Sequence, residues 1–291
     1  MRRQRPRRMG CFGTLLIILL VIAIPVVIIL YDSNTRLVTD EYELFYDNLP
    51  GAFDGYRIVL LADLHGAEHG ENNERLVERV RDANPDIITI VGDLIDDYQP
   101  GNPVDQQIEI SRTLVTQLVQ IAPVYYVSGN HEWATGRMLE IFAMLEESGV
   151  TVLRNQYRTL TRGGDSIILA GVDDPNGPAD MTTPTELVDR IYENENPDFI
   201  IMLSHRNYNL GLYSRLGVDL ILSGHAHGGM VRLPFTDGLI GPYGEFFPTY
   251  TSGVYTRGSA HMVVSRGLGN HFGWTRFLNN PHVVVVELRA R

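Results

Sequence analysis

The sequence of 291 residues contains no lysine and only one cysteine, Cys11. A single cysteine cannot form an intramolecular disulfide, and it cannot supply the set of thiolates that structural zinc sites use. Any metal bound by this chain must therefore be held by nitrogen and oxygen atoms. The absence of lysine leaves arginine as the only basic residue, which we attribute to genome composition rather than to mechanism.

Positive charge is scarce in most of the chain. Five of the 24 arginines precede Cys11, which leaves 19 of them against 35 acidic residues in the rest of the sequence. Proteins that bind nucleic acid generally need a basic surface, so this acidic balance argues against a nucleic-acid partner. No internal repeat or low-complexity linker is present, and the length suits one large domain or two small ones.

A long apolar run follows the first arginines. Residues 12–31 carry no charge and are rich in Leu, Ile and Val. About 20 apolar residues can span a bilayer as a helix, so we predict a transmembrane anchor over 11–31. The arginines within 1–10 and the acidic Asp32 predict a cytoplasmic N-terminus, an anchor in the cytoplasmic membrane and an extracytoplasmic remainder.

A cleaved signal peptide is the alternative interpretation of this run. Its apolar region would be shorter, roughly 7–15 residues, and would end in small residues before the cut. The segment Tyr31-Asp32-Ser33-Asn34 offers no such site, which favours an uncleaved anchor. Adjacent arginines near the N-terminus also fit a twin-arginine export signal.

After a lead-in over 32–56, apolar runs and helical patterns alternate. Short apolar runs predict strands at 57–61, 87–91, 124–127, 150–153, 167–170, 199–203, 220–222, 261–265 and 283–288, with a further strand at 43–46. Helices are expected near 72–83, 104–121 and 136–148. This order predicts an α/β fold in which two sheets pack face to face with helices outside, in one domain over 57–291. The Pro- and Gly-rich stretch 234–248 is long enough to suggest a functional loop over a site.

Polar side chains follow five of the predicted strands at the point where each ends. Because ligands bind outside the carboxyl ends of strands in α/β sheets, we expect these side chains to meet at one edge. They are Asp63, His65, Asp93, Asn130, His205, His225 and His227. Imidazole suits Zn and Fe, and carboxylate and amide oxygens suit Mn, so this set predicts two divalent ions that share one carboxylate. Such pairs of ions, ~3.5–4 Å apart, clamp the attacking and leaving oxygens of a phosphoryl transfer and lower the pKa of bound water.

These residues resemble the five motifs of the calcineurin-like metallophosphoesterases, in the family's order, over about 57–230. The motifs are Asp63-x-His65, Gly92-Asp93, Gly129-Asn130-His131-Glu132, His205 and Gly224-His225-x-His227. Gly-Asn-His-Glu together with Gly-His-x-His is specific, whereas Asp-x-His and Gly-Asp alone are weak. The resemblance implies a fold of four layers, with two mixed sheets flanked by helices.

The resemblance also implies a role for each residue. The first ion is expected on Asp63, His65 and His227, the second on Asn130, His205 and His225, with Asp93 bridging them. His131 is expected to face the substrate and to protonate the leaving oxygen. Asp96 stands where related protein phosphatases have an aspartate paired with that histidine. The next residue is Asp97, where those phosphatases have arginine, and this departure argues against phosphoprotein specificity.

The C-terminal third resembles a narrower group, the bacterial membrane-associated phosphodiesterases. The matching segments are 171–175, 203–206, 228–234 and 265–269. This branch implies a phosphodiester or pyrophosphate substrate, such as an envelope lipid or a lipid-linked compound. A phosphomonoesterase or nucleotidase with the same site is the enzymatic alternative. A non-catalytic, tethered metal-binding scaffold is the other alternative, although its usual mark is a broken ligand set, and none of the seven ligands is broken.

The remaining candidates are weaker. Arg206 and Arg266 could bind substrate phosphate, and an ordinary ion pair explains each of them equally well. Glu132 is expected to position the turn that carries Asn130 and His131. Structural or surface roles are expected for the histidines outside the motifs and packing roles for the two tryptophans, namely His69, His261, His271, His282, Trp133 and Trp274.

Overall fold

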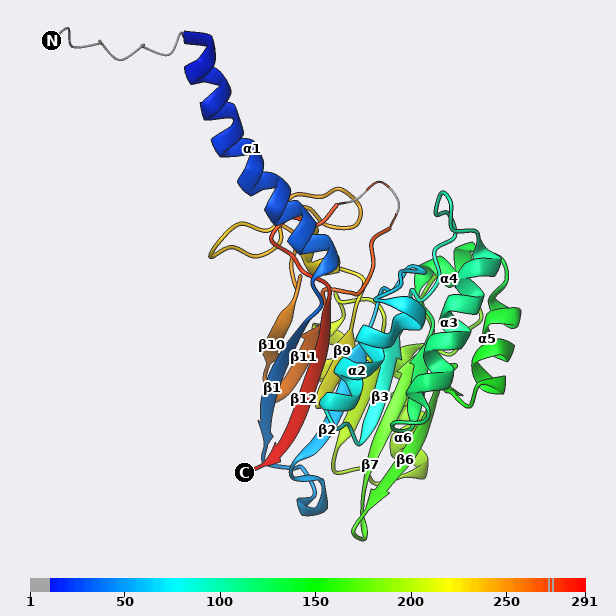
Figure 1. The fold of residues 1–291 in the computed structure, drawn as a ribbon. Coiled ribbons are helices and arrows are strands. Elements are labelled where there is room, and N and C mark those ends of the chain that lie inside the picture. The colour runs from blue at the N-terminus through cyan, green and yellow to red at the C-terminus, as the bar shows by residue number, and fades with distance from the viewer. Residues whose placement is uncertain (1–10, 272, 274) are drawn as a thin grey trace, which may run out of the picture.

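The computed structural model describes residues 11–271, 273 and 275–291, so the predicted cytoplasmic segment 1–10 and Trp274 lie outside the described residues. The first element is the helix α1, Cys11–Thr35, which projects away from the folded domain (Figure 1). It is long and apolar enough to cross a membrane, and its apolar window is entirely exposed. The helix continues past the predicted end at residue 31, and its last turns contact the domain.

The strands form two mixed sheets of six strands each. The first has the order β1-β12-β2-β3-β4-β5 and consists of β1 (Val38–Tyr46), β2 (Tyr56–Leu61), β3 (Ile87–Val91), β4 (Val124–Val127), β5 (Thr151–Val152) and β12 (His282–Ala290). The second has the order β10-β11-β9-β8-β7-β6 and consists of β6 (Gln156–Arg162), β7 (Asp165–Val172), β8 (Ile200–Ser204), β9 (Leu220–Ser223), β10 (Gly253–Arg257) and β11 (Ala260–Val264).

Helices cover the outer face of each sheet. The helices on the first sheet are α2 (Glu74–Asp82), α3 (Val104–Leu118) and α5 (Met138–Glu147), and those on the second are α6 (Pro184–Asn194) and α7 (Leu210–Arg215). One apolar core lies between the two sheets, and one lies under each helical layer. This arrangement confirms the predicted four layers (Figure 1).

The sequence patterns explain these layers. In α3, Ile108, Leu114, Val115 and Leu118 recur at helical spacing and are buried against the first sheet. All five residues of β3 are buried, as expected for a parallel strand covered on both faces. Burying one large aliphatic side chain stabilises a fold by about 1.5–3 kcal/mol, so these faces hold the layers together.

The structure places more of the chain in the sheets than the sequence predicts. Strand β1 pairs with β12 along its whole length, from Val38 opposite His282 to Tyr46 opposite Ala290. The strand predicted at 43–46, within the segment 32–56, is thus present and begins earlier, at Val38. The strands β6 and β10 and the helices α6 and α7 are also additions to the prediction.

Strand direction fixes where the candidate residues lie. Strands β2, β3 and β4 are parallel to one another, as are β8 and β9, so their carboxyl ends form one end of the domain. Strand β12 is antiparallel to β2 and parallel to β1, which starts just after α1. The foot of α1 therefore lies at the same end as those carboxyl ends (Figure 1).

Candidate metal centre

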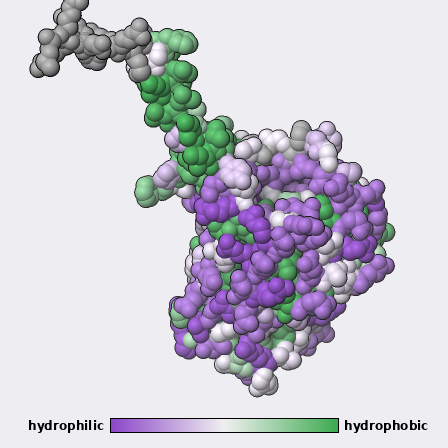
Figure 2. All heavy atoms as spheres, viewed as in Figure 1, coloured by the Kyte–Doolittle hydropathy of each residue, from purple (hydrophilic) through white to green (hydrophobic). Residues whose placement is uncertain are grey.

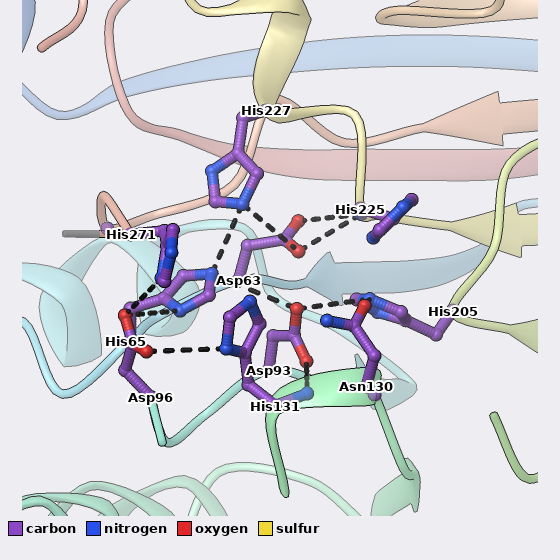
Figure 3. Close-up of polar contacts among 12 residues, drawn as sticks. Asp63, His65, Asp93, Asp96, Asn130, His131, His205, His225, His227 and His271 are labelled. Carbon is purple, nitrogen blue, oxygen red and sulfur yellow. Dashed lines mark hydrogen bonds and ion pairs between the residues drawn. The ribbon is translucent and has the colours of Figure 1, made fainter. Parts of the chain in front are cut away.

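All seven predicted ligands meet at this end of the domain (Figure 3). They form two clusters whose potential ligand atoms lie within 4.8 Å of one another: Asp63, His65 and His227 in the first cluster, and Asp93, His205 and His225 in the second. Oδ2 of Asp93 is 3.1 Å from Nε2 of His205 and 3.9 Å from Nε2 of His65, so Asp93 lies between the clusters. Oδ1 of Asn130 is 3.1 Å from the same nitrogen of His205.

The backbone is strained at most of these positions. Left-handed φ values occur at Asp63 (51°), His65 (49°), Asp93 (53°), His225 (66°) and His227 (48°). A left-handed conformation costs a non-glycine residue about 1–2 kcal/mol and occurs preferentially at functional sites. The strained turns aim the side chains of different loops at one point.

Close backbone approach explains the glycine before His225. A Cβ on Gly224 would lie 2.7 Å from Oδ2 of Asp63 and 2.7 Å from the Cβ of Ala62. Glycine at this position lets the loop after β9 pack directly against Asp63. The amide of His225 then donates to both carboxylate oxygens of Asp63, at 3.0 and 3.1 Å.

Hydrogen bonds prepare individual ligands. Nδ1 of His205 donates to the carbonyl of Val91 at 2.7 Å, which orients Nε2 of the ring toward Asp93 and Asn130. Oδ1 of Asp93 accepts from the amide of His131 at 2.9 Å, so its Oδ2 faces the clusters. Nε2 of His65 and Nε2 of His227 face each other at 3.1 Å, as two ligands of one ion would.

The carboxylate of Glu132 fixes the loops that follow β3 and β4. It is fully buried and accepts from the amides of Asp93 (3.0 Å), Leu94 (2.5 Å), Ile95 (3.2 Å) and Gly129 (2.9 Å). Burial and the nearby charge of Asp93 raise the pKa of Glu132 to about 7. The structure thus gives Glu132 the positioning role expected from the sequence.

Burial and neighbouring charges shift the pKa values of the clusters in both directions. Burial acts to lower the pKa of His205, but the carboxylate of Asp93 outweighs it and raises that pKa to about 9. Burial, followed by the neighbouring charge of His205, lowers the pKa of His225 to about 2, and burial holds the pKa of His227 well below its ordinary value. Burial raises the pKa of Asp63 to about 6. For Asp93, burial also acts upward, but His205 outweighs it and holds the pKa well below the usual range. His225 and His227 are therefore neutral, which is the form that binds metals, and a divalent ion can replace the proton that His205 holds beside Asp93. The residues thus fit a pair of divalent ions.

A group of acidic and imidazole side chains lies beside the first cluster. Nδ1 of His131 is 2.5 Å from Oδ1 of Asp97 and 3.3 Å from Oδ1 of the buried Asp96. Oδ2 of Asp96 is 2.9 Å from Nδ1 of His271 and 3.4 Å from Nδ1 of His65. Asp96 thus contacts three histidines rather than the single one expected.

His271 corrects the prediction, since it belongs to the site rather than to the surface or the structural framework. Its segment enters the site from the region before β12, far from the metal motifs in sequence. No motif contains it, although the segment 265–269, which carries the resemblance to the membrane-associated branch, directly precedes it. That resemblance was the one sign in the sequence that this part of the chain contributes to the site.

Carboxylates surround His131 at the wall of a cavity. Burial acts to lower its pKa, but the carboxylates of Asp96 and Asp93 outweigh burial and raise the pKa to about 10. The ring is therefore cationic at neutral pH. It faces a cavity of about 250 Å³ whose wall also includes Met230, Pro242, Tyr243 and His271.

The two candidate arginines lie in different surroundings. Arg206 forms a bidentate pair with Asp174, at 2.6 and 3.1 Å, and its Nη1 lies 2.9 Å from Nε2 of His225. The same Nη1 donates to the hydroxyl of Tyr243. Nη2 of Arg266 is 3.1 Å from Oδ2 of Asp40 on β1. Arg266 is not among the described residues that line the cavity.

The other histidines and Trp133 have the packing or structural surroundings that the sequence predicts. His69 is buried against the carbonyl of Leu268, and His282 is buried beside Asp40. The indole nitrogen of Trp133 donates to the hydroxyl of Ser128 at 2.9 Å.

Comparison with known proteins agrees with this geometry. The family model described as calcineurin-like phosphoesterase matches residues 56–229. The chain belongs to the calcineurin-like phosphoesterase family. All seven ligand candidates lie within the matched range, including the residues of both clusters.

Members of this family with related sequences occur in bacteria and animals. The uncharacterized metallophosphoesterase YkuE of Bacillus subtilis is 30% identical over 266 residues, which cover 89% of this chain and 88% of that protein. The phosphodiesterase YaeI of Escherichia coli is 25% identical over 271 residues, which cover 87% of this chain and 88% of that protein.

A relative from Danio rerio is described as a transmembrane protein with metallophosphoesterase domain. It is 30% identical over 237 residues, which cover 76% of this chain. The chain spans about half the length of that relative, 52%. The apolar helix α1 and the relatives named as transmembrane proteins indicate that this calcineurin-like chain is anchored in a membrane.

Proposed function

We propose that this protein is a membrane-anchored phosphoesterase that uses two divalent ions, drawn from Mn, Zn or Fe, to hydrolyse a phosphodiester or pyrophosphate bond. The observation that carries the proposal is the position of Asp93, whose carboxylate lies between two clusters of nitrogen and oxygen ligands. A shared carboxylate between two such clusters is the arrangement that a dinuclear centre requires.

Each ligand has a place in this centre. Asp63, His65 and His227 would hold the first ion, and Asn130, His205 and His225 the second, with Asp93 on both. The ions would supply Lewis acidity and would lower the pKa of a bound water so that it can attack phosphorus.

The chain's own groups then handle the leaving oxygen and the phosphate. His131, cationic and held by Asp96 and Asp97, would donate its proton to the leaving oxygen. Arg206 lies next to the second cluster, where its guanidinium can donate to phosphate oxygens. For Arg266, the predicted contact with substrate requires the side chain to leave Asp40.

The proposed substrate is a phosphoester of a cell-envelope lipid or a lipid-linked compound. The arginine-rich N-terminus favours an orientation with the folded domain outside the cytoplasmic membrane, and in that orientation α1 would keep the site near lipid headgroups. Fusion of reporters after residue 291 tests this topology: an alkaline phosphatase fusion is expected to be active, and a fluorescent protein fusion dark. A fluorescent cytoplasmic fusion would contradict the outside placement and would favour a lipid-linked sugar nucleotide made in the cytoplasm.

The reaction class is tested with the full chain in detergent, loaded with Mn. We expect hydrolysis of a bis-aryl phosphate to exceed hydrolysis of a mono-aryl phosphate, and Asp93→Asn to abolish both. Preference for the mono-aryl ester would identify a phosphomonoesterase or nucleotidase instead. No hydrolysis across a broad panel of phosphoesters, together with an unchanged cellular role for Asp93→Asn, would identify a tethered scaffold.

A further inference from the structure

The loop over the metal cavity carries exposed aromatic side chains. This loop, residues 231–250, contains the Pro- and Gly-rich stretch 234–248 that the sequence predicts as a loop over a site, and we call it the aromatic loop. Phe235 is 107% exposed, Phe246 75% and Phe247 74%. Tyr243 of the same loop is also exposed on one side, while it lines the cavity on the other. Several large apolar side chains exposed within one loop indicate a site of interaction rather than ordinary solvent-facing structure.

The aromatic loop lies at the end of the domain from which α1 departs. Figure 1 shows the loop beside the foot of α1, and Figure 2 shows α1 as an apolar rod above a largely hydrophilic domain. The loop is fixed there by the segment 276–280. The amide of Arg232 donates to the carbonyl of Phe277 at 2.9 Å, and the side chain of Asn279 donates to the carbonyl of Met230 at 3.1 Å.

The same segment holds the last turns of α1. Oδ1 of Asn34 accepts from the amide of Arg276 at 3.1 Å, and Nδ2 of Asn34 donates to the carbonyl of Arg276 at 2.9 Å. The side chain of Asn280 donates to the carbonyl of Asp32 at 2.7 Å. These contacts set the direction in which α1 leaves the domain, so a bilayer crossed by α1 faces the aromatic loop.

We propose that the aromatic loop docks into the headgroup region of the bilayer that α1 crosses, with Phe235, Phe246 and Phe247 in the interface. Aromatic side chains favour this region of a membrane. Pro242 and Tyr243 of the same loop form part of the wall of the cavity that His131 faces. Docking of the loop therefore opens that cavity at the level of the lipid phosphates. The site then takes phosphoesters from the bilayer in preference to soluble ones.

The loop is also coupled to the second cluster. The hydroxyl of Tyr243 accepts from Arg206, whose guanidinium lies beside His225. A loop that is seated in the interface therefore positions a side chain that touches the site. The claim about the substrate rests on the proposed phosphoesterase function, whereas the docking itself does not.

The docking is tested with the full chain in liposomes of phosphatidylethanolamine and phosphatidylglycerol. In a Cys11→Ser background, Phe247→Cys carries a bimane label, and a second sample carries the label at Thr161→Cys on the β6–β7 hairpin at the opposite end. We expect brominated lipids to quench the label at 247 and to leave the label at 161 unaffected. Equal absence of quenching at both positions overturns the docking.

An activity measurement tests the substrate claim. The variant with Phe235→Ser, Phe246→Ser and Phe247→Ser should hydrolyse a bilayer phospholipid about tenfold more slowly than the natural chain, because the loop no longer seats in the interface. Its hydrolysis of soluble bis-aryl phosphate should be unchanged. The matched control replaces two exposed aromatics at the opposite end, Phe45→Ser and Tyr192→Ser, and should leave both rates unchanged.

The outcomes separate the two proposals. Quenching at 247 without hydrolysis of any phosphoester by the natural chain supports docking and overturns the proposed function. Hydrolysis of the soluble ester without quenching at 247 supports the function and overturns the docking. An equal loss of both activities in the triple variant overturns the claim that the loop presents lipid to the site.

Discussion

Nδ1 of His131 lies 2.5 Å from Oδ1 of Asp97 at the edge of the metal cavity. The sequence predicts Asp96 as the partner of this histidine, and the structure adds a second carboxylate at the position where related protein phosphatases have arginine. Together with Asp96 and Asp93, this carboxylate acts against burial and raises the pKa of His131 to about 10.

Replacing Asp97 with Asn should therefore move the alkaline limb of the rate profile. The active form of His131 is protonated, so activity is present below its pKa and is lost as pH rises through it. Removing one carboxylate lowers that pKa, and we expect the loss of kcat to begin roughly one pH unit lower. The measurement is kcat against pH with bis-aryl phosphate, and Asp97→Glu is the control that keeps the charge. An unmoved alkaline limb would show that Asp97 does not act on the proton donor.

Arg206 and Arg266 should differ as phosphate ligands. Arg206 contacts His225 of the second cluster, whereas Arg266 pairs with Asp40. Lysine retains the charge but lacks the planar fork that binds phosphate at two points. We expect Arg206→Lys to raise KM about tenfold, and Arg266→Lys to leave KM unchanged. Steady-state kinetics of the two variants show which arginine binds the substrate phosphate. A raised KM in Arg266→Lys alone would identify Arg266, and not Arg206, as the phosphate ligand.

Loss of the Glu132 carboxylate should destabilise the fold. Glutamine keeps one acceptor oxygen but turns an NH2 group toward amides that also donate. We expect Glu132→Gln to lower the free energy of unfolding by about 3–5 kcal/mol, because buried donors lose their partner. Glu140→Gln, in an exposed pair with Arg137, should leave the free energy of unfolding almost unchanged. Urea unfolding at pH 8 measures both, and equal stability of the two variants would contradict the role given to Glu132.

His282 should make the fold sensitive to acid. Burial lowers its pKa from 6.5 to about 4, and the nearby Asp40 only partly opposes this. Below pH 6.5 the unfolded chain takes up the proton first, so stability falls as pH falls toward 4, by about 1.4 kcal/mol per pH unit. His282→Gln keeps an acceptor for the amide of Arg266 and should flatten this dependence. Thermal unfolding from pH 4 to 7 compares the two chains, and parallel curves would rule out His282 as the source.

The ligand set could be found from the sequence because its members follow the carboxyl ends of buried strands. The runs before Asp63 and Asp93 form the neighbouring parallel strands β2 and β3, so these two residues lie side by side at one edge. His225 follows β9 of the second sheet, and it meets them because the two sheets pack face to face. His271 could not be found in this way. Its place beside Asp96 depends on how the segment before β12 crosses the end of the domain, where Asn34 of α1 holds Asn270 at 2.9 Å.

The missing elements have similar physical reasons. Strand β6 lies at the edge of its sheet and buries only Leu160, so its pattern carries no apolar run. The sequence predicts only residues 43–46 of strand β1, and its first part is identified by pairing with β12, more than two hundred residues later in the chain. Helix α6, by contrast, could be predicted from the sequence, because Thr183 and Glu186 form a capping box around Pro184 at its start.

The metal content of the purified full chain tests the dinuclear centre most directly. After loading with Mn and removal of free metal, elemental analysis should find two ions per chain, since six of the seven ligand candidates form two clusters and the carboxylate of Asp93 lies between them. His227→Gln, which removes a ligand of the first cluster alone, should retain one ion. Asp93→Asn should weaken both sites and abolish hydrolysis. A natural chain that binds one ion or none, or an Asp93→Asn chain that keeps two ions and full activity, would contradict the account.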